Sequence, residues 1–176
     1  MNRIFLKISL GVLVASSLLW TASAAVVGNV KQLSGHVPAA VAHLTSTGRL
    51  SATNRLHLAI GLPLRNQSAM HLLLQQINDP SSSNYRHYLT SEQFNDQFGP
   101  TAEEYQAAID FAKAGGLMVT RTHGNRMLLE VEGQAAEVEK TFNVTLHTYH
   151  HPTENREFFA PNIEPSVPAG QSPLSL

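Results

Sequence analysis

The sequence contains no cysteine, and this absence excludes several kinds of chemistry at once. Disulfide bridges, thiolate metal sites and cysteine nucleophiles all require that residue. Charge is also scarce, because 12 basic and 13 acidic side chains among 176 residues give a formal net charge of −1. This composition predicts no basic footprint for nucleic acid. With 43% apolar residues, the chain can bury the core of one domain.

Long apolar runs are missing too, except near the N-terminus. Two basic residues precede an uncharged apolar stretch at 8–20, and the small residues Thr-Ala-Ser-Ala follow it. This order is typical of a secretory signal peptide, residues 1–24, cleaved between Ala24 and Ala25. The alternative is an uncleaved membrane anchor, but the stretch is shorter than the ~20 apolar residues that a bilayer requires. We therefore expect a secreted or periplasmic protein that has no membrane contact after cleavage.

Hydrophobic periodicity predicts the elements that follow an irregular lead-in, residues 25–54. Apolar residues alternate over 56–64, which is typical of a half-buried strand. Asn66 is a candidate N-cap for the next helix, and two Thr-x-x-Gln/Glu capping boxes begin further helices. The predicted helices end at Asp79-Pro80, Gly99-Pro100 and Gly115-Gly116. The predicted remainder is two strands over 117–122 and 127–132 joined by a hairpin at His123-Gly124-Asn125, a helix over 133–142, a strand over 144–149, and a pairing segment at 157–159.

The order strand, helices, strand, strand, helix, strand predicts an α+β fold. It is the split β-α-β arrangement of ferredoxin-like folds, an antiparallel sheet with helices on one face. The segment Pro80–Pro100 is an insertion in this plan. Beyond Ala160 the chain is rich in proline, which predicts an extended, solvated tail over residues 160–176; its prolines are Pro161, Pro165, Pro168 and Pro173.

Residue types that catalyse reactions or bind metals are present without the spacing that either role needs. No Gly-x-Ser-x-Gly elbow surrounds a serine, and the three serines after Pro80 are interpreted as a turn. Three carboxylate pairs have structural interpretations, as a helix N-terminus (Glu103, Glu104), the solvent face of a strand (Glu130, Glu132) and the polar side of a helix (Glu137, Glu139). The best metal candidates are His147, His150 and His151, but the first and last lie ~13 Å apart along a strand. We therefore predict no catalytic residue, cofactor site or metal site in these residues.

One segment is more specific than the rest of the chain. Residues 79–94 have the sequence Asp-Pro-Ser-Ser-Ser-Asn-Tyr-Arg-His-Tyr-Leu-Thr-Ser-Glu-Gln-Phe. This signature segment closely resembles part of the activation domain (propeptide) of sedolisin and kumamolisin-like serine-carboxyl peptidases. The resemblance rests on Asp79, Pro80, Asn84, Tyr85, His87, Tyr88, Leu89, Thr90, Gln93 and Phe94. Further likeness at 36–38, 62–67 and 133–149 extends it over most of the chain.

The resemblance implies a fold like that of subtilase-type propeptides, with a pro-kumamolisin-like activation domain over residues 55–159. It also implies a partner, the catalytic domain of a sedolisin-type peptidase. The activation domain would assist the folding of that catalytic domain and block its cleft. The family's Ser-Glu-Asp triad and calcium site find no matching positions here, so no enzymatic activity is expected of this chain. Two alternatives stay open: the N-terminal fragment of a secreted serine-carboxyl endopeptidase precursor, and an extracellular binding domain without a peptidase partner.

Two further expectations concern pH and the C-terminus. Without residues 1–24 the chain keeps 10 basic and 13 acidic side chains, a formal charge of −3, which protonation of all nine histidines would bring to +6. Histidine has an ordinary pKa of ~6.5, so most of this change falls between neutral and acidic pH. The tail, with Ala160, Pro161, Pro165 and Pro168 as the cleft-contacting candidates, is expected to be flexible in the free protein and ordered on a peptidase.

Overall fold

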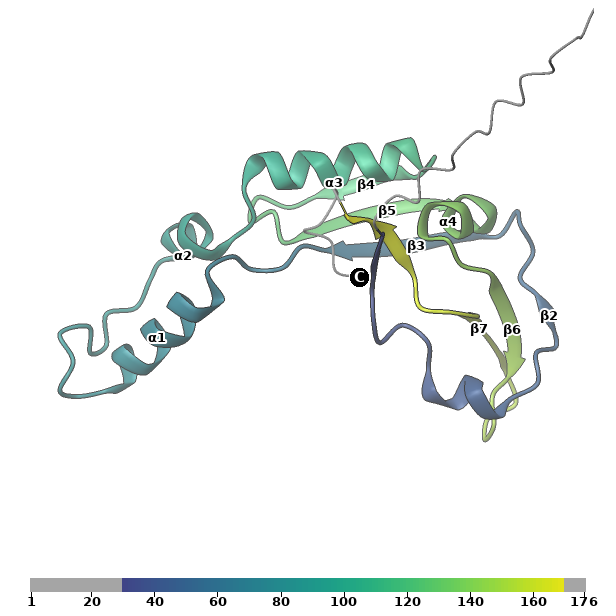
Figure 1. The fold of residues 1–176 in the computed structure, drawn as a ribbon, viewed down its shortest axis with the longest axis horizontal. Helices are drawn as coiled ribbons and strands as arrows, with labels where there is room; N and C mark the ends of the chain where they lie inside the picture. Colours follow the sequence, from purple (N-terminus) through teal and green to yellow (C-terminus); the bar gives the residue numbers. More distant parts are fainter. Residues whose placement is uncertain (1–29, 170–176) are drawn as a thin grey trace, which may run out of the picture.

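An antiparallel three-stranded sheet lies at the centre of the computed structural model, which describes residues 30–169 (Figure 1). Its strands are β3 (Arg55–Gly61), β4 (Met118–Thr122) and β5 (Leu128–Gln134), in the order β3-β5-β4. Alternate residues of β3 and β5 are buried on one face, as the period of two predicts. The predicted signal peptide and its predicted cleavage site between Ala24 and Ala25 lie outside the described residues, as does Pro173.

Two helices cover the buried face of this central sheet. They are α3 (Ala102–Ala114) and α4 (Ala135–Phe142), and their apolar residues join the strand residues in one core. Both predicted capping boxes are confirmed, at Thr90 and at Thr101. Gly116 has a φ of 91° and ends α3 as predicted. The hydrogen bond from Leu117 N to Ala112 O completes this end. The predicted α+β class with antiparallel strands and helices is confirmed.

The helices α1 (Gln67–Asn78) and α2 (Ser91–Phe98) form an arm, residues 67–98, that projects from one end of the molecule (Figure 1). The insertion therefore includes α1 as well as the predicted segment after Pro80. Arg65 fastens the arm at its base, because its backbone N–H donates to Phe98 O and its side chain to the Gly99 and Asp96 carbonyls. Asn66 occupies the N-cap of α1, but its side chain donates to Gln97 O instead of capping the helix, so that detail of the prediction is wrong.

A second sheet contains the strand that was expected to complete the central one. It has the order β2-β6-β7, formed by β2 (Gly48–Arg49), β6 (Leu146–His150) and β7 (Glu157–Pro161). The pairing of β7 with β6 confirms the sequence expectation for 157–159. The strand β6 pairs with β7 along one edge and with β2 along the other, and β2 is formed by residues that precede β3 in the sequence. The antiparallel architecture is therefore divided between sheets instead of forming one continuous sheet.

The two ends of the described chain pair with each other. The strand β1 (Val30–Gln32) runs antiparallel to β8 (Ser166–Pro168), and a 3-10 helix, η1 (Ala39–His43), follows β1. Val167 has only 1% of its surface exposed. The predictions of an irregular lead-in and a solvated tail are therefore wrong for this part of the chain. Proline is tolerated here because Pro168 lies at the end of a strand. Within residues 30–169, no helix combines the length and the apolar character needed to span a bilayer.

Candidate protein-binding surface

The central sheet leaves its second face to solvent, and we call this face the open face. Antiparallel register aligns His57, Glu132 and Met118 in one row and Ala59, Glu130 and Arg121 in the next. A β-bulge between Val119 and Arg121 shifts the register of β4 and brings Arg121 opposite Glu130. The sequence expectation that Glu130 and Glu132 share the solvent face of a strand agrees with this register.

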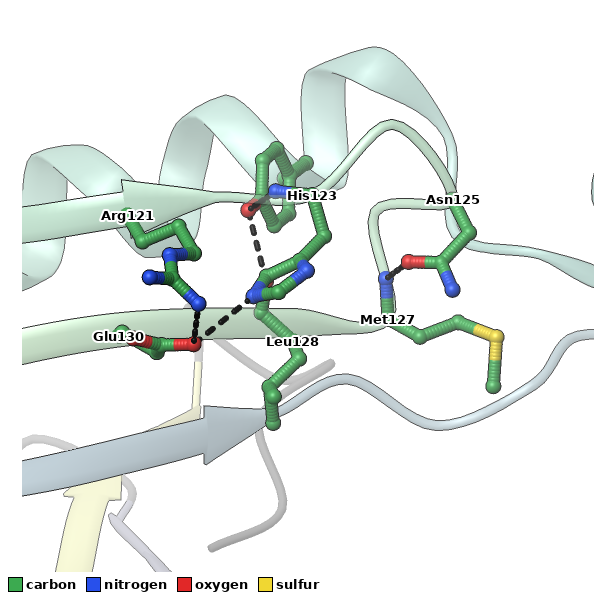
Figure 2. A network of polar contacts seen from close by, with 7 residues as sticks. Arg121, His123, Asn125, Met127, Leu128 and Glu130 are labelled. Atoms are coloured by element: carbon green, nitrogen blue, oxygen red, sulfur yellow. Dashed lines mark hydrogen bonds and ion pairs between the residues drawn. The ribbon is translucent and has the colours of Figure 1, made fainter.

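The first of two charge clusters on the open face surrounds Glu130. Arg121 Nη1 lies 3.6 Å and His123 Nε2 lies 3.1 Å from Glu130 Oε1 (Figure 2). The predicted hairpin positions His123, since the Tyr105 hydroxyl accepts from His123 N and donates to Leu128 O. The residue with positive φ in this hairpin is Arg126, at 57°, and not one of the predicted three.

The second cluster repeats this arrangement around Glu132. Arg55 Nη1 contacts Glu132 Oε1, and His57 Nδ1 lies 3.6 Å from Glu132 Oε2. Each glutamate of β5 is thus flanked by one arginine and one histidine from an edge strand or the adjoining hairpin. Sequence reasoning did not identify these partners, although the alternation of β3 places Arg55 and His57 on the polar side.

The signature segment mainly builds the arm. Asp79 Oδ1 accepts hydrogen bonds from the backbone and the hydroxyl of Ser81, and that hydroxyl holds the pKa of Asp79 below its usual range. Asn84 donates to the Gln76 side chain, and Arg86 N donates to Ile77 O. These bonds fasten the loop to α1.

Apolar and capping residues of the signature complete the arm. Leu89 and Phe94 line a cavity of about 160 Å³ against α1, and Thr90 with Gln93 caps α2. Tyr85 is half-buried, with the Arg86 guanidinium carbon 5.1 Å from its ring centroid. The other exposed members of the signature are Pro80, His87 and Tyr88; Asp79, Thr90 and Gln93 are exposed as well, but they make the turn and capping bonds given above. The signature is thus explained chiefly by the folding of the arm.

The residues proposed as a cleft-contacting tail are part of the fold. Ala160 lies in β7 with 2% of its surface exposed, and Pro165 is buried. Pro161 and Pro165 line an apolar groove of about 260 Å³ between β3, α4 and the second sheet. The Glu164 carboxylate accepts from Gly35 N and His36 N, and the His36 N–H lowers the pKa of Glu164. The expectation of a flexible segment from Ala160 to Pro168 is therefore wrong.

The other candidate residues from the sequence have separate partners. Ser46 Oγ lies 3.1 Å from His147 Nδ1, while His150 and His151 contact Glu157 and Glu154. Within residues 30–169, no three His, Asp or Glu side chains are grouped as metal ligands would be. The carboxylate pair on α4 differs from expectation, because Glu139 has only 7% of its surface exposed. It is held by Arg49 and by Leu146 N, which makes it a structural group of the domain.

The order of strands and helices and the helix-free sheet face define an α+β domain of the ferredoxin-like propeptide class. Comparison with known proteins identifies the family. A family model described as the pro-kumamolisin activation domain matches residues 42–173, three quarters of the chain. The chain belongs to this pro-kumamolisin activation domain family.

Named relatives are peptidases. The chain is 30% identical over 120 residues to xanthomonalisin of Xanthomonas sp. (strain T-22), which covers 68% of this chain and 14% of that protein. It is 30% identical over 100 residues to sedolisin of Pseudomonas sp. (strain 101), covering 57% and 17%. It is 29% identical over 118 residues to tripeptidyl-peptidase sed1 of Aspergillus fumigatus, covering 66% and 18%. The chain thus spans less than a fifth of these relatives' lengths.

Proposed function

We propose that this domain is exported, binds the catalytic domain of a sedolisin-type serine peptidase through the open face, assists its folding and blocks its cleft. The observation that supports the open face as the docking surface is the difference between the two faces of the central sheet. One side of the central sheet is buried under α3 and α4, whereas the other carries exposed side chains such as Met118, 55% exposed. A three-stranded face with mixed charge and an exposed methionine is suited to protein recognition.

The test is inhibition of a sedolisin-type peptidase by the purified domain, together with recovery of activity when that peptidase is refolded with and without it. The variant Met118→Asp is expected to weaken inhibition about tenfold, because an apolar contact is replaced by a charge. Ile163→Asp is the matched control, since Ile163 is 50% exposed and lies outside the central sheet. Equal loss of inhibition in both variants contradicts docking by the open face.

A second candidate function follows from the share of the relatives that the chain covers. The matches cover 14–18% of the relatives' lengths. The N-terminal part of a longer peptidase precursor would give matches of the same extent. In that case the domain acts on a catalytic domain within the same polypeptide, and the sequence is the N-terminal fragment of a secreted serine-carboxyl endopeptidase precursor. Detection of casein cleavage by the purified natural protein supports this candidate.

The third candidate is an extracellular binding domain without a peptidase partner. Affinity capture from the natural secretions, with the open-face variant Met118→Asp as the negative control, separates it from the first. Recovery of a peptidase that the variant fails to recover supports the first proposal, and recovery of none supports the third.

A further inference from the structure

The open face presents its cations outward and its carboxylates inward. The side chains of Arg55 and Arg121 are each 68% exposed and that of His57 is 76% exposed. Those of Glu130 and Glu132 are 35% and 14% exposed. The strand order is the cause, because the glutamates lie on the central strand β5 and the long basic side chains reach over them from β3 and β4.

A protein approaching this face therefore meets the basic groups first. One nitrogen of each guanidinium contacts a glutamate, and a guanidinium carries five N–H donors in a fixed geometry. The remaining donors of Arg55 and Arg121 are free to bind an acceptor on another protein. His57 and His123 add positive charge to the same face whenever they are protonated. The glutamates are already paired, so a cationic partner would have to displace these arginines.

On these grounds, and resting on the proposed function, we infer that the open face recognises an acidic surface of its partner peptidase, through carboxylates that bind Arg55 and Arg121. The two clusters are centred on residues two apart along β5, about 7 Å. The partner surface would therefore carry at least two carboxylates at a spacing of this order. Glu130 and Glu132 act as positioning residues, which hold the guanidinium groups in place before binding.

The experiment measures the association rate constant of the natural exported protein with a sedolisin-type peptidase in low and high salt. The double variant Arg55→Gln/Arg121→Gln is expected to associate at least about tenfold more slowly in low salt, because charged surfaces steer encounter. This difference disappears in 1 M salt, where charges are screened within about 3 Å. Arg55→Lys/Arg121→Lys retains the charges and most of the rate.

The matched control is Arg156→Gln. Arg156 is also exposed, at 54%, and paired with a glutamate, Glu154, but it lies in the turn between β6 and β7. This control should associate as the unaltered protein does. An unchanged or faster rate for the glutamine double variant overturns the acidic-partner inference while the proposed function stands. If the unaltered protein does not bind the peptidase at all, both are overturned.

Discussion

Replacing Glu139 with glutamine tests whether one buried carboxylate joins the helical layer to the second sheet. The side chain of Glu139 is 8% exposed and accepts from Leu146 N at 2.7 Å. Arg49 donates to the same carboxylate through Nη2 at 2.5 Å and Nε at 3.3 Å. These bonds connect α4 with the first residue of β6 and the last residue of β2.

Glutamine keeps the shape of the side chain and one acceptor oxygen, but it replaces the other oxygen with a donor that faces Arg49. The variant therefore loses the negative charge and the bond from Arg49 Nη2 to Oε2, while the remaining oxygen keeps the position of Oε1, which accepts from Leu146 N and Arg49 Nε. A hydrogen bond to a charged group contributes about 1.5–3 kcal/mol, so we expect Glu139→Gln to lower the free energy of unfolding by about 2 kcal/mol at pH 7. Glu154→Gln is the control, because it removes an exposed Arg–Glu pair and should change stability little.

The effect also has a defined pH dependence. The Arg49 side chain holds the pKa of Glu139 below its usual range; burial acts in the opposite direction, and the Leu146 N–H assists Arg49. A carboxylate with a lowered pKa in the folded state contributes its stability above the ordinary pKa of about 4.3, and loses it as pH falls through the folded value. The difference between the natural protein and Glu139→Gln should therefore be largest at neutral pH and shrink below pH 4.

Urea unfolding followed by circular dichroism at pH 7, 5 and 3 measures this difference directly. Equal stabilities of the two proteins at pH 7 would refute the role of the carboxylate. A difference that stays constant from pH 7 to pH 3 would refute its ionised form as the cause.

The remaining predictions concern the strand β8, the N-terminus of the exported protein and the effect of pH on binding. Val167→Ala should lower the free energy of unfolding by about 2 kcal/mol, because Val167 is buried, whereas Val30→Ala, at a site 63% exposed, should have a small effect. Truncation of the chain after Ala160 removes β8 and should lower the free energy of unfolding more than Val167→Ala does. An unchanged urea midpoint in the truncated chain would show that β8 is dispensable. Mass spectrometry of the exported protein should find Ala25 at its N-terminus; an intact Met1 in a membrane fraction contradicts cleavage. Affinity for a sedolisin-type catalytic domain should change between pH 7 and pH 4 as the histidines gain charge, and a constant affinity rejects a histidine switch.

The elements that were predicted from the sequence are those whose signals are local. The alternation that begins at Leu56 predicted β3, and the capping boxes at Thr90 and Thr101 predicted where α2 and α3 begin. The pair Gly115-Gly116 predicted the end of α3, because only a few neighbouring residues decide that geometry. The signature segment also predicted the family, which the match over residues 42–173 shows.

The missed features depend on partners far apart in the sequence. The strands β1 and β8 have three residues each, too short for a period-two pattern, and they form only by pairing with each other. Helical periodicity placed Glu139 on the polar side of α4, and its burial results from the second sheet, which covers that side and supplies Leu146 N.

The sequence by itself determined the α+β class, the order of the main elements and the polar character of the open face, because periodicity and capping act over a few residues. Only the tertiary structure decided which charges meet there. The bulge in β4 sets Arg121 opposite Glu130, and the register of β3 sets His57 opposite Glu132. Register depends on the packing of whole strands against the helices, so no local pattern in the chain specifies these pairs.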